Sequence, residues 1–171
     1  MFSKIKTIFP FLFIIPVFLY GEGSLFSYQF GYSSNDTTQK PPNRGGFYNG
    51  VDFLSTSPSG FGVGAGFDLN VWDAPSSYGR NATMFSMGAT AKMGYTFQSR
   101  YNIPIKLKAG IGYGVIKSVD DSGWGIQYEA GAEYLLYKSL GMGIKYKYAE
   151  ANLLETTFKN NSTIFMMVFA Y

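Results

Sequence analysis

The chain has 171 residues, with 14 Lys and Arg against 11 Asp and Glu, a formal net charge of +3. It contains neither Cys nor His, which excludes disulfides, thiol nucleophiles, imidazole metal ligands and Ser-His-Asp catalysis. The charge is too mild to indicate a nucleic-acid partner, and no basic run supports one. We expect no nucleic-acid partner and a non-enzymatic protein with no cofactor and no catalytic or metal site.

The chain opens with the features of a secretory signal peptide. Lys4 and Lys6 precede an apolar run over residues 7–20, which is shorter than the roughly 20 apolar residues that a membrane-spanning helix needs. Small residues end the segment. We therefore expect residues 1–23 to be a cleaved signal peptide and residues 24–171 to be the mature domain.

Eight segments of the mature chain alternate between apolar and polar side chains, the pattern of strands with one apolar face. They cover residues 25–33, 46–55, 61–72, 84–97, 103–115, 124–134, 140–148 and 162–171. Most are about 9–11 residues long, the length that a tilted strand needs to cross a bilayer. The second segment is the least regular, because Asn49 falls on its apolar face.

The connections between these segments alternate in length. Those after the first, third, fifth and seventh segments have about 12, 11, 8 and 13 residues, and the others about 5, as in barrels with long loops at one rim and tight turns at the other. The sequence therefore predicts an all-β fold, an eight-stranded antiparallel up-and-down transmembrane β-barrel.

Three features indicate that the apolar face contacts lipid. Charged residues avoid this face, glycines gather on the opposite face, as a narrow lumen requires, and aromatic residues lie near the strand ends with alanines between them. A soluble, lipocalin-like barrel remains the alternative. The charged side chains that we expect inside the barrel are Asp52, Asp68, Lys92, Lys106, Lys108, Glu129, Glu133, Lys145 and Lys147.

The order of the strands predicts how these charges pair. Lys106 and Lys108 should lie near Glu133 and Glu129, and Lys145 should reach Glu129 from the other side, which makes Glu129 the expected centre. Asp52 and Asp68 should face lysines across the lumen. We interpret the set as a salt-bridged polar plug, because buried charges persist only when they are paired. The alternatives are an ion path or a catalytic carboxylate pair.

With its signal peptide, eight alternating strands and final segment FMMVFAY, the chain resembles the small eight-stranded outer-membrane barrels of Gram-negative bacteria, the OmpA-type transmembrane barrel in the broad sense. Such chains often end in an aromatic residue with apolar residues at every second position before it. Phe165, Met167, Phe169 and Tyr171 match, and the resemblance implies that the barrel-assembly machinery recognises this segment. The terminal residue is more usually Phe.

The resemblance implies residence in the outer membrane, contact with outer-membrane lipid and lipopolysaccharide, and a monomeric state. Related barrels that modify lipid A, a palmitoyltransferase and a deacylase, use a catalytic His that is missing here. Loop residues could contact divalent cations or lipopolysaccharide phosphates by charge. The acidic and basic candidates are Asp73, Asp120, Asp121, Lys40, Arg44 and Arg80.

These observations favour a non-enzymatic barrel with a structural role in envelope integrity and loops presented at the cell surface. Two other functions stay open. The barrel could be a narrow porin-like channel for small solutes, or a surface adhesin that contacts a host.

Overall fold

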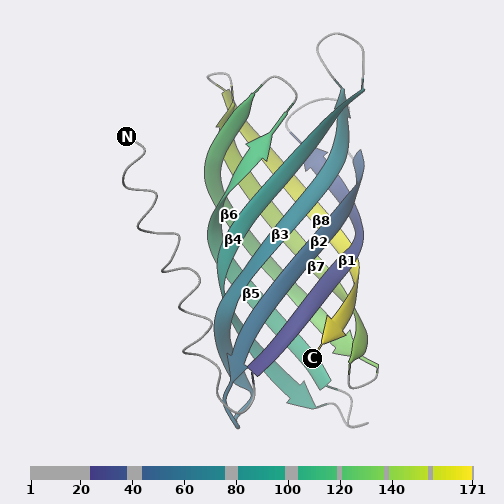
Figure 1. Ribbon diagram of the computed structural model, residues 1–171, viewed down its shortest axis with the longest axis vertical. Helices are drawn as coiled ribbons and strands as arrows, with labels where there is room; N and C mark the ends of the chain where they lie inside the picture. The colour runs from purple at the N-terminus through teal and green to yellow at the C-terminus, as the bar shows by residue number, and fades with distance from the viewer. Residues whose placement is uncertain are drawn as a thin grey trace.

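The structure, a computed structural model, describes residues 24–37, 44–75, 81–98, 104–118, 121–136, 139–153 and 156–170. The strands are β1 (Ser24–Thr37), β2 (Arg44–Thr56), β3 (Phe61–Pro75), β4 (Asn81–Gln98), β5 (Pro104–Lys117), β6 (Ser122–Leu135), β7 (Leu140–Leu153) and β8 (Thr156–Ala170). Each pairs antiparallel with the next, and β8 pairs with β1 to close the barrel (Figure 1). The predicted eight-stranded antiparallel up-and-down barrel is confirmed.

The register of the strands sets their tilt. The line of paired residues that starts at Phe26 on β1 passes once around the barrel and returns to β1 at Asp36, ten residues further on. This stagger inclines the strands by roughly 40° to the barrel axis, and Figure 1 shows them running obliquely. Each step from one strand to the next along such a line therefore climbs about 3 Å.

Side chains alternate between a largely polar interior and an apolar exterior. The inward residues Ile164, Met166 and Val168 of β8 are an exception in this zone, because they are apolar and buried. On β5, Lys106 and Lys108 are only 8% and 7% exposed, whereas Ile111 is 56% exposed. On β6, Glu129 is buried while Trp124 is 62% exposed. This arrangement is the reverse of a water-soluble barrel and matches a barrel whose outside contacts lipid. Separately, none of the described residues forms a helix long and apolar enough to cross a membrane.

At the rim where long loops were expected, the strands continue instead. β7 extends to Leu153 and β8 begins at Thr156, although the sequence predicted a connection from 149 to 161. Glu150 still pairs with Lys159 on the neighbouring strand. The predicted loops were too long because the strands were recognised by their apolar alternation, which ends where the outer face becomes polar. The backbone hydrogen bonds of the sheet continue beyond that point, since they do not depend on apolar side chains.

In these extensions the two faces of the sheet exchange their character. Leu153 and Phe158 point inward and are buried, while Lys159 on the outer face is exposed. The buried side chains form an upper apolar layer that consists of Trp72, Met84, Ile116, Ala149, Ala151, Leu153 and Phe158. This end of the barrel therefore has an apolar core and a polar outside, as a protein in water does.

Candidate functional site

The candidate site is the charged interior of the barrel. Strand alternation turns one residue in two inward, and the structure places all of the predicted interior charges among the buried residues. They are Asp52 on β2, Asp68 on β3, Lys92 on β4, Lys106 and Lys108 on β5, Glu129 and Glu133 on β6, and Lys145 and Lys147 on β7.

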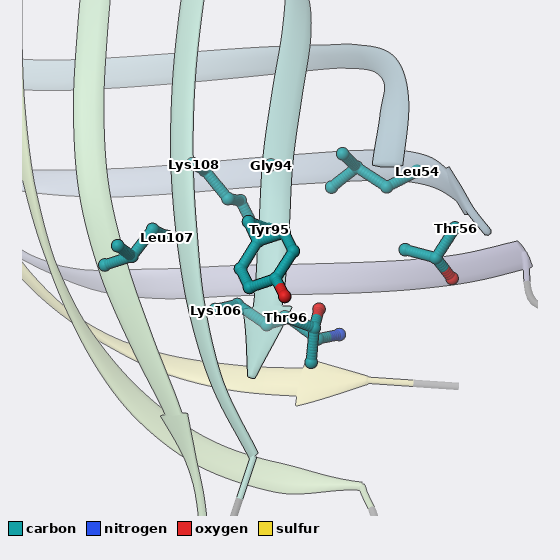
Figure 2. A pocket seen from close by; sticks show the side chains of 8 residues that line it. All are labelled: Leu54, Thr56, Gly94, Tyr95, Thr96, Lys106, Leu107 and Lys108. Atoms are coloured by element: carbon teal, nitrogen blue, oxygen red, sulfur yellow. The ribbon is translucent and has the colours of Figure 1, made fainter. Parts of the chain in front are cut away.

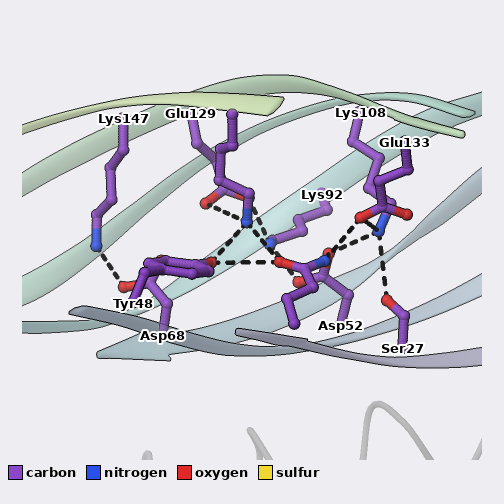
Figure 3. Close-up of polar contacts among 11 residues, drawn as sticks. Ser27, Tyr48, Asp52, Asp68, Lys92, Lys108, Glu129, Glu133 and Lys147 are labelled. Atoms are coloured by element: carbon purple, nitrogen blue, oxygen red, sulfur yellow. Dashed lines mark hydrogen bonds and ion pairs between the residues drawn. The ribbon is translucent and has the colours of Figure 1, made fainter. Parts of the chain in front are cut away.

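Asp52, and not Glu129 as the sequence predicted, is the carboxylate at the centre of the network (Figure 3). Its Oδ1 atom accepts from Lys92 Nζ, and its Oδ2 atom accepts from Lys108 Nζ at 2.8 Å and from Gln29 Nε2 at 2.6 Å. The side chain is fully buried. Donors from β1, β4 and β5 therefore converge on one carboxylate of β2, and they compensate for its loss of water.

Glu133 shares two of these donors. Lys108 Nζ lies 2.5 Å from Glu133 Oε1, and Gln29 Nε2 donates to the same oxygen at 2.8 Å. Lys108 also contacts Ser27 Oγ at 3.4 Å. Lys108 and Gln29 thus bridge two carboxylates that come from strands on different sides of the lumen.

Glu129 lies next to this cluster and pairs with two lysines. Lys92 Nζ contacts its Oε1 atom, and Lys145 Nζ lies 3.5 Å from its Oε2 atom. Lys145 also donates to Gln29 Oε1 at 2.9 Å and to Tyr48 Oη at 2.7 Å. A continuous network of hydrogen bonds and ion pairs therefore runs through the middle of the barrel.

Lys147 and Asp68 form a separate buried ion pair (Figure 3). The register places this pair nearer the upper rim than Asp52. Lys147 faces Glu129 across the ladder between β6 and β7, but its ammonium group reaches β3 instead. Asp52 and Asp68 therefore both contact lysines on distant strands, as the sequence predicted.

The prediction that Lys108 pairs with Glu129 was wrong. Lys108 lies opposite Gly131 on β6, and its ammonium group contacts Asp52 and Glu133 rather than Glu129. Closure of the barrel brings β2 within reach across the lumen, and this contact is not apparent from neighbouring strands alone. Lys106 lies opposite Glu133 in the ladder, but among the described residues it has no ion pair.

Glycines leave the room that these long side chains need. A Cβ atom on Gly66 would lie 2.3 Å from Lys92 Cε and 2.5 Å from Asp52 Oδ1. The inward faces at Gly88 and Gly114 are occupied in the same way by the Gln127 amide. The predicted reason for inward glycines, a narrow lumen filled by side chains, agrees with these distances.

Neutral polar side chains form the next layer toward the upper rim. Ser33 Oγ donates to Asn70 Oδ1 at 2.6 Å, and Asn70 Nδ2 donates to Asn35 Oδ1 at 2.7 Å. Ser162 Oγ also donates to Asn35 Oδ1, at 2.8 Å. The upper apolar layer lies beyond these residues. Three successive layers therefore fill the lumen from the charged network to that end of the barrel.

A small cavity lies at the opposite end, against the wall formed by β2, β4 and β5 (Figure 2). Its volume of about 10 Å³ holds one water molecule at most. The residues that line it are Leu54, Thr56, Gly94, Tyr95, Thr96, Lys106, Leu107 and Lys108. The cavity is too small to accept a substrate or to carry hydrated ions.

The other predicted residues fall outside the barrel interior. Phe165 and Met167 are exposed on the outer face of β8, and the Phe169 ring stacks on Phe30 with centroids 5.9 Å apart. Tyr171 lies outside the described residues, as do the signal peptide, Asp120, Lys40, Arg80 and the side chain of Arg44. Within the described ranges, no group of three or more acidic side chains is placed to hold a metal ion.

Comparison with known proteins shows what this architecture is similar to. A family model described as "Outer membrane protein beta-barrel domain" matches residues 19–169. No curated protein matches the sequence.

Solved structures with the same fold include Ail, the attachment invasion locus protein of Yersinia pestis, in complex with the heparin analogue sucrose octasulfate. It has a TM-score of 0.57 and 15% identity, over 86% of this chain and 99% of that one. Neisserial surface protein A matches with a TM-score of 0.58 and 12% identity, over 84% and 96%. The outer membrane enzyme PagL matches with a TM-score of 0.55 and 12% identity, over 81% and 97%.

Proposed function

Because this chain belongs to the outer membrane protein beta-barrel domain family, we propose that it is a non-enzymatic structural barrel of the outer membrane. In this role it contributes to the integrity of the cell envelope and presents one rim at the cell surface. The observation that carries the proposal is the filled interior, in which paired charges, neutral polar groups and the upper apolar layer follow one another.

The filled interior argues against a passage for solutes. Asp52 and Lys92 are 0% and 5% exposed, so other side chains cover the charges that would line an ion path. Eight strands leave a lumen just wide enough for side chains, and here long lysine side chains occupy it. A solute would have to displace the network of paired charges and then Trp72 and Phe158 of the upper apolar layer.

The same pairing supports a non-enzymatic role. Asp52 and Glu133 share Lys108 deep inside the barrel, where no substrate reaches them. A general acid or base must lie within hydrogen-bond reach of its substrate. PagL is named an enzyme, but at 12% identity the similarity indicates a shared fold and not a shared activity. This chain also contains no His.

We also propose that the protein is monomeric, that lipopolysaccharide surrounds it, and that the barrel-assembly machinery inserts it through the segment that ends at Tyr171. A role in surface contact is compatible with the extended strands, which carry polar residues such as Asp73 and Lys117 on their exposed outer face. Ail, which was crystallised with a heparin analogue, is a barrel of the same fold.

Two measurements test the proposal. The purified barrel in planar bilayers should show no steady conductance, and cells that lack the protein should take up a hydrophobic dye faster than wild-type cells. A steady ionic conductance would favour the channel. Unchanged dye uptake together with lost attachment to host surfaces would favour the adhesin.

A further inference from the structure

The apolar band on the outside of the barrel differs in height from one side to the other. On β4 the outward residues are apolar at seven successive positions, namely Phe85, Met87, Ala89, Ala91, Met93, Tyr95 and Phe97. On the opposite wall, the described part of β8 has only Phe165, Met167 and Phe169, and Thr163 and Asn161 follow them toward the upper rim. We call these the tall side and the short side.

The strand register gives the height of each outward residue along the barrel axis. With strands inclined at roughly 40°, one residue climbs about 2.5 Å along the axis. The upper edge of the apolar band therefore lies at Phe85 on the tall side, about 12 Å higher than at Phe165 on the short side. The upper edge falls in steps from Trp124 on β6, through Tyr148 on β7, to Phe165 on β8.

Tilting the whole barrel does not remove the mismatch. A tilt moves the upper and lower edges of the band on one side by the same amount, so it leaves the thickness of the band on that side unchanged. On the tall side, however, the lower edge at Phe97 also lies below that of Phe26 on β1, by the same register. The band is therefore thicker on the tall side, not displaced.

Polar groups on the short side need partners from the membrane. Tyr146 Oη donates to Asn161 Oδ1 at 2.7 Å. This bond uses the amide oxygen, and within the described residues the amide N–H groups of Asn161 have no acceptor. An amide N–H group left unpaired in hydrocarbon is strongly unfavourable.

We propose that the bilayer is locally thinned beside β8 and β1, where the headgroups and water of the upper leaflet descend to Thr163. The headgroup oxygens accept a hydrogen bond from the Asn161 amide. Beside β4 the bilayer keeps its full thickness. This inference depends on insertion into a membrane and not on the structural role proposed above.

The absence of native Cys allows a test by single-cysteine labelling of Thr163→Cys and Met87→Cys. The register places Met87 about 3 Å higher than Thr163 on the opposite wall, and both residues face outward. In bilayer discs, a charged maleimide should modify Thr163→Cys at least about tenfold faster than Met87→Cys, since the lower site lies beside the thinned bilayer.

Control measurements separate protection by lipid from protection by the protein itself. Thr83→Cys, above the band on β4, should react fast in bilayer discs, and in detergent without a bilayer the rates at positions 163 and 87 should approach each other. Equal protection at both sites in bilayer discs, or faster reaction of Met87→Cys, overturns the proposal. Protection of Met87→Cys that disappears at low protein-to-lipid ratio also overturns it, because a second copy would then cover the tall side.

Discussion

Among the described carboxylates of the charged interior, Asp52 has the most partners. Two ammonium groups and an amide donate to its carboxylate, whereas Lys147 is the one ion-pair partner of Asp68 within the described part of the chain. Removal of one partner from a buried charged network leaves the remaining charges without compensation and without water. The energetic importance of each carboxylate should therefore follow its number of buried ammonium partners.

We expect Asp52→Asn to lower the free energy of unfolding by about 3–5 kcal/mol, because Lys92 and Lys108 both lose a buried counter-charge. Asp68→Asn removes the counter-charge of Lys147 alone, so it should lower the free energy of unfolding by less than Asp52→Asn does. Asp73→Asn, on the exposed outer face of the same strand as Asp68, is the control and should stay within about 0.5 kcal/mol of the wild type.

Urea unfolding of the three variants in lipid vesicles measures these differences. Equal values for Asp52→Asn and Asp73→Asn would mean that the interior is hydrated and that its charges do not depend on one another. A double variant, Asp52→Asn with Lys108→Gln, should recover part of the loss, since one stranded ammonium group is then removed.

At the scale of the strand, one backbone ladder passes through two environments. Along β7, Ile144 and Tyr146 face outward and are 46% and 51% exposed, whereas further up the strand Ala151 and Leu153 are buried inside. The exchange occurs within a few residues, because the strand leaves lipid and enters water there. The upper apolar layer should therefore stabilise the extensions in the manner of an ordinary protein core.

We expect Phe158→Ala to destabilise the barrel by about 3–5 kcal/mol, since the ring is 3% exposed and its removal leaves a cavity in the upper apolar layer. Lys159→Ala, the next residue on the outer face, is the matched control and should cost about 0.5 kcal/mol or less. Thermal unfolding monitored by circular dichroism in detergent compares them. If both variants behaved as the wild type does, the extensions would be frayed and not packed.

At the scale of the whole molecule, the barrel encloses its charges in a closed, staggered cylinder. Antiparallel pairing of β1 with β8 leaves no free strand edge, which satisfies the backbone groups within a membrane. The outer face meets lipid and the inner charges meet one another. The stability of the interior should therefore be largely independent of ions in the surrounding solution.

We expect the destabilisation caused by Asp52→Asn to change by less than about 0.5 kcal/mol between roughly 0.05 and 1 M NaCl, because buried pairs are screened far less than exposed ones. The pair of Lys159 and Glu150, at 4.0 Å and roughly half exposed, supplies the contrast. Unfolding titrations of single variants at several salt concentrations test this. A strong salt dependence at Asp52 would show that ions enter the lumen, and the channel would become the better hypothesis.

The sequence by itself was sufficient to predict the number of strands, their antiparallel order and the side that each residue faces. Alternation with a period of two is a local property, and the charges at positions such as Asp52 and Lys108 mark the inner face directly. The absence of His likewise excluded catalysis that depends on an imidazole.

Which charges meet was decided by the tertiary structure. Lys108 contacts Asp52 across the lumen because a stagger of ten residues and closure of β1 on β8 bring β2 and β5 to matching heights. Local alternation carries no information about that stagger. The same is true of the extended strands, where Phe158 was expected in a loop but is buried in β8, and of Asn49, whose partner Tyr28 lies on the neighbouring strand. These contacts exist only once the cylinder has closed.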